Sequence, residues 1–453
     1  MAEEKKLSKV KPRTLSGFME LLPQEQILFN QVQDKIRESY ERYGFLPLDT
    51  PVLEAAEVLL AKTGGETAKQ IYSFKKGDTD LAMRFDLTVP LAKYAAMHQG
   101  ELQFPFKRYQ IGKVYRGERA QAGRFREFYQ ADIDVIGDGK LDLMYDAEIP
   151  SVINKTFTDL GVGDFTIRMN NRKIPNGLFE QLGLKNQTAE ILHSLDKIDK
   201  VGFKAVSKTL NDMGLNSTQI GVIMDFVEIK GTNQEVVDKL KKLGIKNQTY
   251  ETGVSELEQV TDGIKKLGVP EKNLALDPKI TRGLDYYTGT VYETFLNDKK
   301  EIGSVCSGGR YDNLAEYYTD KKMPGVGISI GLTRLFDQLN KTGALKLDKK
   351  SISDIMVVPM TENIGACMQA AAQLRENGIN TEVFFENKKE GQKFQYADKL
   401  NIPYALVVGD NELNEGKYSL RNMRTRDQQL LTMKEIIASL RKTNNQEHHH
   451  HDK

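Results

Sequence analysis

Cysteine is almost absent from the chain, whose 453 residues include only Cys306 and Cys367. Two cysteines form neither a disulfide framework nor a cysteine-rich structural zinc site, so both classes of cross-linked domain are excluded. No apolar run reaches the length of about 18 residues that a membrane-spanning helix requires. The first residues, MAEEKKLSKVKPR, are charged throughout and lack the apolar segment of a secretory signal. These absences favour a cytoplasmic protein without a membrane span.

The chain has almost no net charge, because 64 Lys and Arg residues face 63 Asp and Glu residues. This balance neither supports nor excludes a nucleic-acid partner, since a positive surface can be local. One local excess lies at residues 107–126, where seven basic residues accompany a single acidic one, Glu118. Their alternation with Tyr109, Val114 and Tyr115 is typical of a strand, which points some of the arginines inward rather than onto a solvated face.

Length and composition are those of a soluble protein with several domains. At about 150 residues per domain the length predicts roughly three domains, and 39% hydrophobic with 28% charged residues excludes collagen-like, coiled-coil and disordered chains. Changes in composition divide the chain into a core in two parts (1–174 and 271–340), a helical insertion (175–270), a polar linker (341–351), a small α/β domain (352–442) and a disordered tail (443–453). We interpret the four histidines of the tail as a tag.

Hydrophobic periodicity predicts the elements of the core. We expect a helix over 24–44. The next segment, 45–54, is extended, and Pro47 and Pro51 confine it to an edge or an interface. Strands are expected over 81–88, over the two halves of 104–137 on either side of a loop at 117–124, over 283–296 and over 301–306. The hairpin within 104–137 would be antiparallel and would carry its basic residues on one face and in its loop.

The nucleotide-binding loops that are easiest to recognise are missing. No G-x-x-x-x-G-K-[ST] occurs, so a P-loop is absent. Gly325, Gly327 and Gly331 do not have the spacing of G-x-G-x-x-G, which disfavours a dinucleotide site. We interpret GVGISIG as a glycine-rich strand that a ligand approaches closely, followed by a helix that presents Arg334.

Polar residues gather in the strand-like segments. In MRFDLTVP the alternation places Asp86 and Thr88 on the same side. In RGLDYYTGTVYE, Arg282 stands in an otherwise apolar strand-like segment, where an arginine requires an anion or an acidic partner to offset its desolvation. The paired glycines of CSGGRYDNL allow a close backbone approach before an expected helix. Each feature alone is compatible with a structural role. The polar groups in these segments are too many to be buried for stability alone: Asp86, Thr88, Arg116, Glu118, Arg124, Gln130, Asp134, Arg282 and Arg334.

These motifs together resemble one enzyme family over nearly the whole chain. YRGERAQAGRFREFYQADIDVIG is similar to the second signature motif of class II aminoacyl-tRNA synthetases, GVGISIGLTRLF to the third, and the Pro51 strand to the first. RGLDYYTGTVYE and CSGGRYDNL resemble the two motifs specific to histidyl-tRNA synthetases. One departure is MRFDLTVP, where many bacterial members have an Arg-Pro-Glu-Gly-Thr stretch. Asp86 keeps the carboxylate, so we interpret this as a subgroup variant.

The resemblance implies a fold, a reaction and partners. The fold would be an α+β catalytic domain, an antiparallel sheet flanked by helices, with a helical insertion and a C-terminal α/β domain that binds the anticodon. The reaction would join L-histidine to ATP, with Mg²⁺, to form histidyl-adenylate and diphosphate, and then transfer the acyl group to tRNA-His. The first motif forms part of the dimer interface in this family, so the resemblance implies a homodimer.

The resemblance also assigns roles to residues. The guanidinium groups of Arg116 and Arg334 match phosphate oxygens. For ATP the implied set is Arg116, Glu118, Arg124, Phe128, Arg282 and Arg334, with Phe128 stacked on adenine. The implied catalytic set is Arg282, acting at the α-phosphate, with Arg116 and Gln130. For histidine the α-amino group would meet Asp86, Thr88 and Gln130, and the imidazole would meet Asp134, Tyr287 and Tyr311.

Three alternatives remain at this point. A regulatory histidine-binding paralogue of the synthetase, which does not charge tRNA, typically lacks the C-terminal domain that this chain has. A tRNA-sensing module built on an inactive synthetase would be expected to lose Arg116, Arg282 or Arg334, and all three are present. A different class II synthetase is disfavoured by the two histidine-specific motifs and by the lack of a Cys/His zinc constellation.

Overall fold

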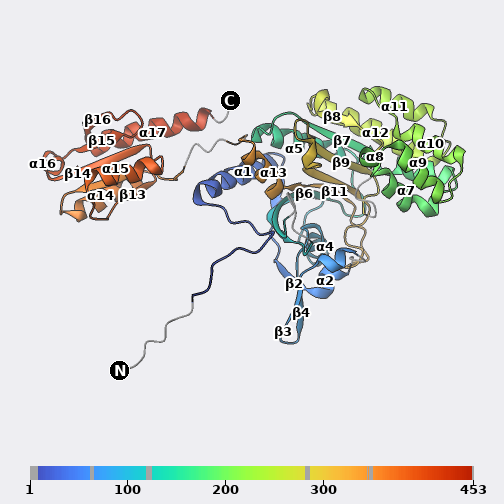
Figure 1. Ribbon diagram of the computed structural model, residues 1–453, viewed down its shortest axis with the longest axis horizontal. Coiled ribbons are helices and arrows are strands. Elements are labelled where there is room, and N and C mark those ends of the chain that lie inside the picture. Colours follow the sequence, from blue (N-terminus) through green and yellow to red (C-terminus); the bar gives the residue numbers. More distant parts are fainter. Residues whose placement is uncertain are drawn as a thin grey trace. The chain divides into compact units, whose positions relative to one another are not determined.

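The computed structural model describes residues 9–61, 66–118, 125–280, 286–343, 345 and 350–450. The chain forms two compact units, one of residues 1–20 and 32–344, the other of residues 21–31 and 345–453. Figure 1 labels many of their helices and strands. Within the part of the chain that the structure describes, no helix combines the length and apolarity needed to cross a membrane.

The centre of the larger unit is an eight-stranded sheet with the order β1-β5-β6-β11-β10-β9-β7-β8. Its strands are β1 (Leu46–Pro47), β5 (Phe106–Tyr115), β6 (Glu127–Ile136), β7 (Phe165–Asn171), β8 (Leu274–Leu276), β9 (Thr290–Leu296), β10 (Cys306–Tyr311) and β11 (Gly325–Gly331). All neighbours are antiparallel except the two edge pairs, β1–β5 and β7–β8. The predicted antiparallel hairpin is β5–β6, and the proline-containing β1 lies at the predicted edge.

Helices cover the sheet on both faces. The helices α1 (Pro23–Arg42) and α5 (Tyr145–Leu160) contact each other through the Ser39 and Thr156 hydroxyls, 2.8 Å apart. From α1, Tyr40 donates a hydrogen bond to the carbonyl of Ala131 in β6. On the other face, α4 (Thr88–Met97) packs its buried Leu91 against Phe106 of β5 and the segment after β10. The helix α13 (Leu332–Lys341) follows the glycine-rich β11 directly, as the sequence predicts.

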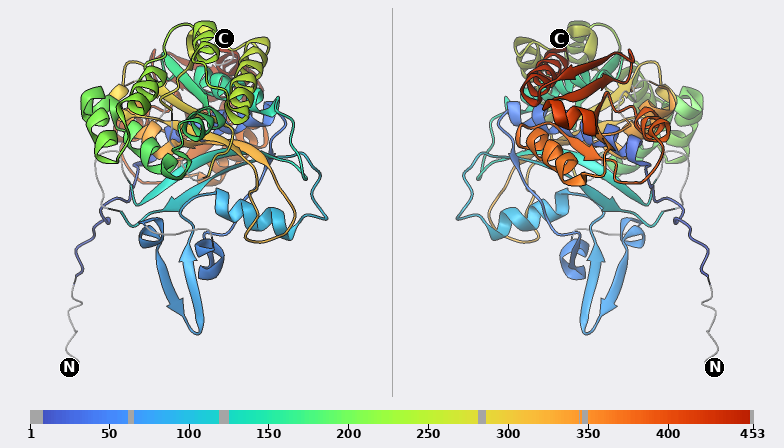
Figure 2. Two further views of the ribbon diagram at one scale, coloured as in Figure 1. Left: turned by 90° about the vertical axis from the view of Figure 1, so that its right-hand side faces the viewer. Right: turned by 90° about the vertical axis from the view of Figure 1, so that its left-hand side faces the viewer.

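Residues 173–266, all of which the structure describes, contain seven α-helices and no strand. They are α6 (Lys173–Gln181), α7 (Thr188–Leu195), α8 (Ile198–Val201), α9 (Phe203–Asp212), α10 (Ser217–Val227), α11 (Asn233–Lys242) and α12 (Gln248–Lys266). Capping boxes start α10 at Asn216 and α11 at Thr232, where a side-chain oxygen accepts from the backbone three residues on. The long α12 packs against α5, α6 and β7, so the helical segment rests on the sheet. These helices are green and yellow in Figures 1 and 2.

A small second sheet of the larger unit has the order β2-β4-β3, formed by β2 (Leu53–Ala55), β3 (Ser73–Lys76) and β4 (Thr79–Met83), beside α2 (Ala56–Leu60) and α3 (Glu66–Gln70). Its β3–β4 hairpin projects from the unit in Figure 2. The predicted strand 81–88 is wrong at its end, because β4 stops at Met83 and Thr88 is the first residue of α4. The Asp86 carboxylate accepts from the Val89 amide at 3.1 Å, which favours the helix start. Asp86 and Thr88 therefore do not share a strand face.

Two further strand predictions need correction. The strand expected over 283–296 begins only at Thr290 among the described residues, and the segment 301–306 is mostly a 3₁₀ turn, η3 (Lys300–Ile302), and loop. The strand is instead β10, the CSGGRY segment itself, and residues 312–324 contain turns rather than the expected helix. A Cβ at Gly308 would overlap the Gly327 carbonyl. The paired glycines thus let neighbouring protein segments approach closely.

The sheet of the smaller unit has the order β13-β12-β14-β15-β16, formed by β12 (Ile355–Met360), β13 (Thr381–Val383), β14 (Tyr404–Gly409), β15 (Tyr418–Asn422) and β16 (Gln428–Leu431). The first three are parallel and alternate with α14 (Ile364–Glu376), α15 (Glu390–Lys399) and α16 (Asp410–Glu415). The antiparallel β15–β16 hairpin is absent from the sequence prediction. The last helix, α17 (Met433–His450), continues through most of the segment predicted to be a disordered tail. The core of the smaller unit contains four fully buried side chains, Ile355, Leu374, Leu406 and Ile436.

Candidate active site

A row of polar residues in the β5–β6 hairpin faces one side of the eight-stranded sheet, here called the front face. Across the ladder Arg108 pairs with Asp134, and in a strand alternate residues share a face. Gln130, Asp132 and Asp134 therefore lie in a row on the front. Lys107 points to the opposite, rear face, where its ammonium group lies 2.9 Å from the Glu148 carboxylate of α5. The prediction that the hairpin carries its basic residues on one face is wrong, because these residues occupy both odd and even positions.

A cavity of about 410 Å³ opens at one end of the front face. Its wall contains five residues that the sequence predicts at the site: Arg116, Glu118, Phe128, Gln130 and Arg334. It also contains residues that the prediction missed, namely Phe125, Ser304, Val305, Cys306, Ser307, Ser329 and Gly331. For Cys306, Ser307, Ser329 and Gly331 the sequence signal is weak, because small residues are common in strands. The cavity brings together segments that are more than 200 residues apart in the chain.

Two arginines enter this cavity from different elements. Arg116 is the residue directly after β5. Its Nε donates a hydrogen bond to the Phe85 carbonyl at 3.1 Å, and its guanidinium lies over the Phe128 ring, 5.1 Å from the ring centroid. Arg334 belongs to the first turn of α13, where the chain leaves the glycine-rich strand. An aromatic ring beside two guanidinium groups suits a ligand that has both a flat heterocycle and phosphate groups.

A second group of residues lies further along the front face, around Asp134. One carboxylate oxygen of Asp134 accepts from the Tyr311 hydroxyl at 3.0 Å, and the other lies 2.6 Å from Nη2 of Arg108. The Tyr286 ring centroid is 5.3 Å from that of Tyr311 and 5.1 Å from that of Tyr287. The structure thus brings the predicted Asp134, Tyr287 and Tyr311 together and adds Arg108 and Tyr286, which the prediction missed.

The glycines of β11 make room for this group. A Cβ at Gly327 would overlap the Asp134 carboxylate, and a Cβ at Gly325 would overlap the Tyr311 ring. The strand was predicted to be approached closely by a ligand. In the structure the neighbouring protein side chains are what approach these two positions, so the glycines shape the pocket indirectly.

Three carboxyl groups of the front face have a raised pKa. Burial raises the pKa of Asp132 to about 7, and Arg108 offsets only part of the rise. Burial likewise raises the pKa of Asp134 to about 6, against the opposing effects of Arg108 and of the Tyr311 hydroxyl. The pKa of Asp86 is also raised by burial, with its bond to the Val89 amide and the charge of Arg116 acting against this. An excess of buried carboxyl groups suits a ligand that brings a cation or N–H donors.

Three of the remaining predicted residues, Asp86, Thr88 and Gln130, are at least partly buried near the two groups. Asp86 and Thr88 are half-buried at the start of α4. The charges of Arg116 and Arg108 both act to lower the pKa of Asp86. The Gln130 Oε1 atom is buried and has no hydrogen-bond partner among the described residues, so it is available to a ligand. Arg124 and Arg282 lie outside the described residues.

Comparison with known proteins decides the family. A family model described as histidyl-tRNA synthetase matches residues 17–335, and one described as an anticodon-binding domain matches residues 354–443. The histidine–tRNA ligase of Clostridium tetani is 54% identical over 429 residues, which are 94% of this chain and 98% of that protein. The chain belongs to the histidyl-tRNA synthetase family.

Solved structures agree with this assignment. The crystal structure of histidyl-tRNA synthetase from Nostoc sp. PCC 7120 has a TM-score of 0.88 and 41% identity, over 96% of this chain and all of that one. A structure from Bacillus halodurans C, described as an ATP phosphoribosyltransferase regulatory subunit/histidyl-tRNA synthetase, has a TM-score of 0.73 over 86% of this chain and 97% of that one, and only 18% identity, which shows the shared fold alone.

The predicted family, fold class and enzyme class are therefore confirmed. The fold is the class II catalytic domain followed by an anticodon-binding domain, and the activity is that of an aminoacyl-tRNA ligase specific for histidine. The high identity to curated histidine–tRNA ligases supports the synthetase over the regulatory paralogue. The sequence motifs sufficed for this result because several of them occur in the family's order.

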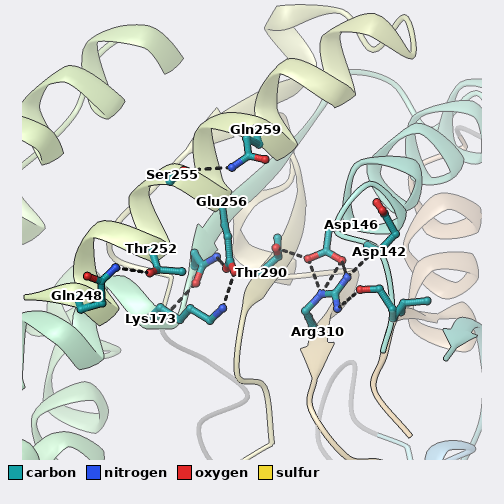
Figure 3. A network of polar contacts seen from close by, with 12 residues as sticks. Asp142, Asp146, Lys173, Gln248, Thr252, Ser255, Glu256, Gln259, Thr290 and Arg310 are labelled. Atoms are coloured by element: carbon teal, nitrogen blue, oxygen red, sulfur yellow. Dashed lines mark hydrogen bonds and ion pairs between the residues drawn. The ribbon is translucent and has the colours of Figure 1, made fainter. Parts of the chain in front are cut away.

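Behind the histidine-specific motifs, the rear face of the sheet holds a polar network (Figure 3). The Arg310 guanidinium of β10 lies 2.7 Å from the fully buried Asp146 of α5 and also donates to the Leu141 and Asp142 carbonyls. Thr290 of β9 donates to the same carboxylate at 2.5 Å. A separate group lies alongside, in which Glu256 of α12 accepts from Lys173 and Asn171. These contacts tie β9, β10 and the helical segment to the back of the active site.

Proposed function

We propose that the front face carries out both steps of histidyl-tRNA synthesis. In the first step the histidine carboxylate attacks the α-phosphorus of ATP, and diphosphate leaves. In the second step a hydroxyl of the terminal ribose of tRNA-His attacks the acyl carbon, and AMP leaves. The observation that carries this proposal is the cavity of about 410 Å³ beside Asp134, since it contains Arg116, Phe128 and Arg334 together.

ATP occupies the cavity in this proposal. Phe128 stacks on adenine, while Arg116 and Arg334 hold the triphosphate through bidentate hydrogen bonds. Glu118 accepts from the adenine amino group, and Arg124 adds a further contact. Arg282 acts on the α-phosphate, where negative charge builds up in the transition state, and Arg116 and Gln130 assist it.

Mg²⁺ accompanies the triphosphate. No cluster of three His, Cys, Asp or Glu residues that could hold a metal ion occurs in the described ranges. The oxygen donors of the cavity are Glu118, Gln130 and the serine hydroxyls. Such hard oxygen ligands suit a magnesium ion that is held mainly by phosphate oxygens, and the bound ion neutralises part of the triphosphate charge.

Histidine binds next to ATP on the same face. The α-amino group meets Asp86, Thr88 and the free carbonyl oxygen of Gln130. The imidazole lies among Asp134, Tyr287 and Tyr311. The Asp134 carboxylate accepts a hydrogen bond from one ring N–H, and a tyrosine hydroxyl contacts the other ring nitrogen. A pocket built on such hydrogen bonds rejects an analogue without ring nitrogens by about 10⁴–10⁵-fold, because its own polar groups would be left unpaired.

The test of this function is amino-acid-dependent exchange of diphosphate into ATP, measured with each of the twenty amino acids. Histidine should support exchange and the others should not. A preference for any other amino acid would contradict the proposal. Aminoacylation of tRNA-His by the same preparation then tests the second step.

We propose that residues 352–442 bind the anticodon, while the core (1–174 and 271–340) activates histidine and the helical insertion (175–270) rests on it. A chain that ends within the linker 341–351 should keep diphosphate exchange and lose most tRNA charging. The support for this division is the independent core of the smaller unit, built around Val357 and Leu406. Equal loss of both activities in a folded truncation would contradict it.

We further propose that the protein is a cytoplasmic homodimer. The edge strand β1 contains Pro47 and leaves Leu46 58% exposed, and Leu53 of β2 is 44% exposed. Exposed leucines at a sheet edge favour burial against another subunit. Sedimentation at micromolar concentration should give twice the chain mass of 51.2 kDa. A monomer would contradict the proposed assembly.

A further inference from the structure

Arg108 is a fully buried arginine on the front face that the proposed roles above do not use. Its side chain has no exposed surface. Nη2 lies 2.6 Å from the Asp134 carboxylate and 3.5 Å from the Leu87 carbonyl, and the Nε and Nη1 atoms have no hydrogen-bond partner among the described residues. Buried donors are nearly always paired when they serve stability. An arginine that is held by one carboxylate and otherwise left unpaired is therefore a poor structural element.

A second buried arginine of the same unit gives the contrast. Arg84 is 3% exposed, and it donates from Nε to the Lys113 carbonyl at 2.7 Å and from Nη1 to the Thr50 carbonyl at 2.5 Å. Its guanidinium thus binds the backbone of two other segments, as a structural arginine does. Arg108 instead has one strong partner, and that partner faces the pocket beside Tyr311.

We propose that Arg108 is a positioning residue for histidine specificity, because it keeps the Asp134 carboxylate ionised and turned so that it accepts a hydrogen bond from the imidazole. This inference rests on the proposed role of Asp134. With Arg108 on one oxygen and Tyr311 on the other, the carboxylate has a fixed orientation and keeps lone pairs for the ligand. Arg108 thus acts on histidine through Asp134.

The charges around Asp134 explain why an arginine is needed there. The carboxylate is buried, and two further carboxyl groups, Asp86 and Asp132, act on the same region. The other groups that face it are Arg108 from β5, Tyr311 from β10, and Tyr286 and Tyr287 from the segment before β9. Among the described residues, Arg108 is the cation that offsets the raised pKa of both Asp132 and Asp134, whereas Arg116 acts on Asp86. Without Arg108, Asp134 would take up a proton and lose its ability to accept from an imidazole N–H.

The experiment compares Arg108→Met with the wild type in histidine-dependent diphosphate exchange between pH 6 and pH 8.5. We expect KM for histidine to rise by about 10²-fold at pH 7, as for other truncations of a buried hydrogen-bonded charge pair. KM for ATP should change by less than about threefold. The ratio of the two histidine KM values should fall as the pH rises, because Asp134 then regains its charge. The ratio cancels the titration of the substrate imidazole.

Arg84→Lys is the matched control, since it perturbs an equally buried arginine that touches no carboxylate of the pocket at hydrogen-bond distance. Its effect on histidine KM should not vary with pH. Asp134→Asn should reproduce the loss without the pH dependence, and adding Arg108→Met to it should cause little further loss. If Arg108→Met does not fold, Arg108→Lys should raise KM by about tenfold and keep the wild-type pH profile.

The outcomes separate this inference from the proposed function. A wild-type protein without histidine-dependent exchange contradicts the proposed function. A wild type that exchanges normally, with an Arg108→Met loss that is absent or the same at every pH, contradicts the inference alone. Additive losses in the double variant contradict it as well.

Discussion

The two faces of the eight-stranded sheet each bury an arginine–aspartate pair, and the pairs differ in how completely they are bonded. On the rear face, Asp146 accepts from Arg310 and Thr290, and Arg310 uses all three of its nitrogens. On the front face, Arg108 has one close partner, and two of its nitrogens have no hydrogen-bond partner in the part of the chain that the structure describes. A complete network stabilises the fold, while an incomplete one leaves hydrogen-bonding capacity for a ligand.

The comparison predicts that front-face residues affect activity more than stability. The largest effect follows from the role proposed for Arg282, which lies outside the described residues. Arg282→Ala should lower the rate of histidine activation by about 10²–10³-fold with small changes in either KM, because a preorganised cation at the α-phosphate helps the transition state most. Arg282→Lys should recover little, since an ammonium group lacks the planar fork. Single-turnover adenylate formation measures this. Weaker histidine binding at an unchanged saturated rate would make Arg282 a substrate anchor instead.

Substitutions of rear-face residues should affect stability more than activity. Asp146→Ala leaves Arg310 buried without its counter-ion and should lower the free energy of unfolding by about 3–5 kcal/mol. Denaturant unfolding of the full chain measures the change. In the fraction that stays folded, KM for histidine and ATP should remain near the wild-type values. A normal unfolding curve with a raised histidine KM would reverse the assignment of the two faces.

A smaller effect, on both stability and histidine binding, is expected from a substitution in the glycine-rich strand β11. Gly327→Ala places a methyl group against the Asp134 carboxylate. Overpacking of this kind costs about 1–3 kcal/mol, and it should also raise KM for histidine because Asp134 must move. Gly365→Ala, at a glycine of the smaller unit whose Cβ would meet only Asn363 at 3.5 Å, is the control and should leave histidine KM unchanged. Equal histidine KM in both variants would show that Asp134 is not tightly positioned.

The smallest expected effect is the pH dependence of stability that Asp132 causes. The pKa of Asp132 is raised to about 7 in the folded protein, so the folded state binds the proton more tightly than the unfolded chain does. The contribution of this group to stability is therefore lost as the pH rises from about 4 to about 7. Asp132→Asn should raise the melting temperature by a few degrees at pH 8 and hardly at all at pH 5. Asp146→Asn should lower it at both pH values. A stabilisation by Asp132→Asn that does not depend on pH would contradict the assignment.

Much of the cavity could be predicted from the sequence because its residues stand in local motifs. Phe128, Gln130 and Arg334 lie in segments whose strand or helix type the periodicity indicates correctly, and Arg116 directly follows one such strand. One error, the strand predicted over 81–88, arose where a polar side chain redirects the chain. Asp86 accepts from an amide of the next helix, which ends the expected strand early, and this kind of local capping competes with strand propensity.

Asp132 could have been found from the sequence, since it stands between Gln130 and Asp134 at the spacing that shares a strand face. Arg108 is different. Its place in the basic segment marks it as an inward arginine, but its partner is 26 residues away, and their pairing depends on the register of β5 with β6. A shift of one residue would turn the whole row of carboxyl groups to the other face.

The sequence by itself determined the family, the edge position of the proline-containing strand and the glycine-rich strand that leads into a helix with Arg334. These features depend on residues close together in the chain, where spacing and backbone preference suffice. Only the tertiary structure decided which arginine meets which carboxylate: Arg108 with Asp134 on the front, Arg310 with Asp146 on the rear. Such pairings depend on strand register and on helix packing across the sheet, and local sequence patterns do not encode distances between segments that are far apart in the chain.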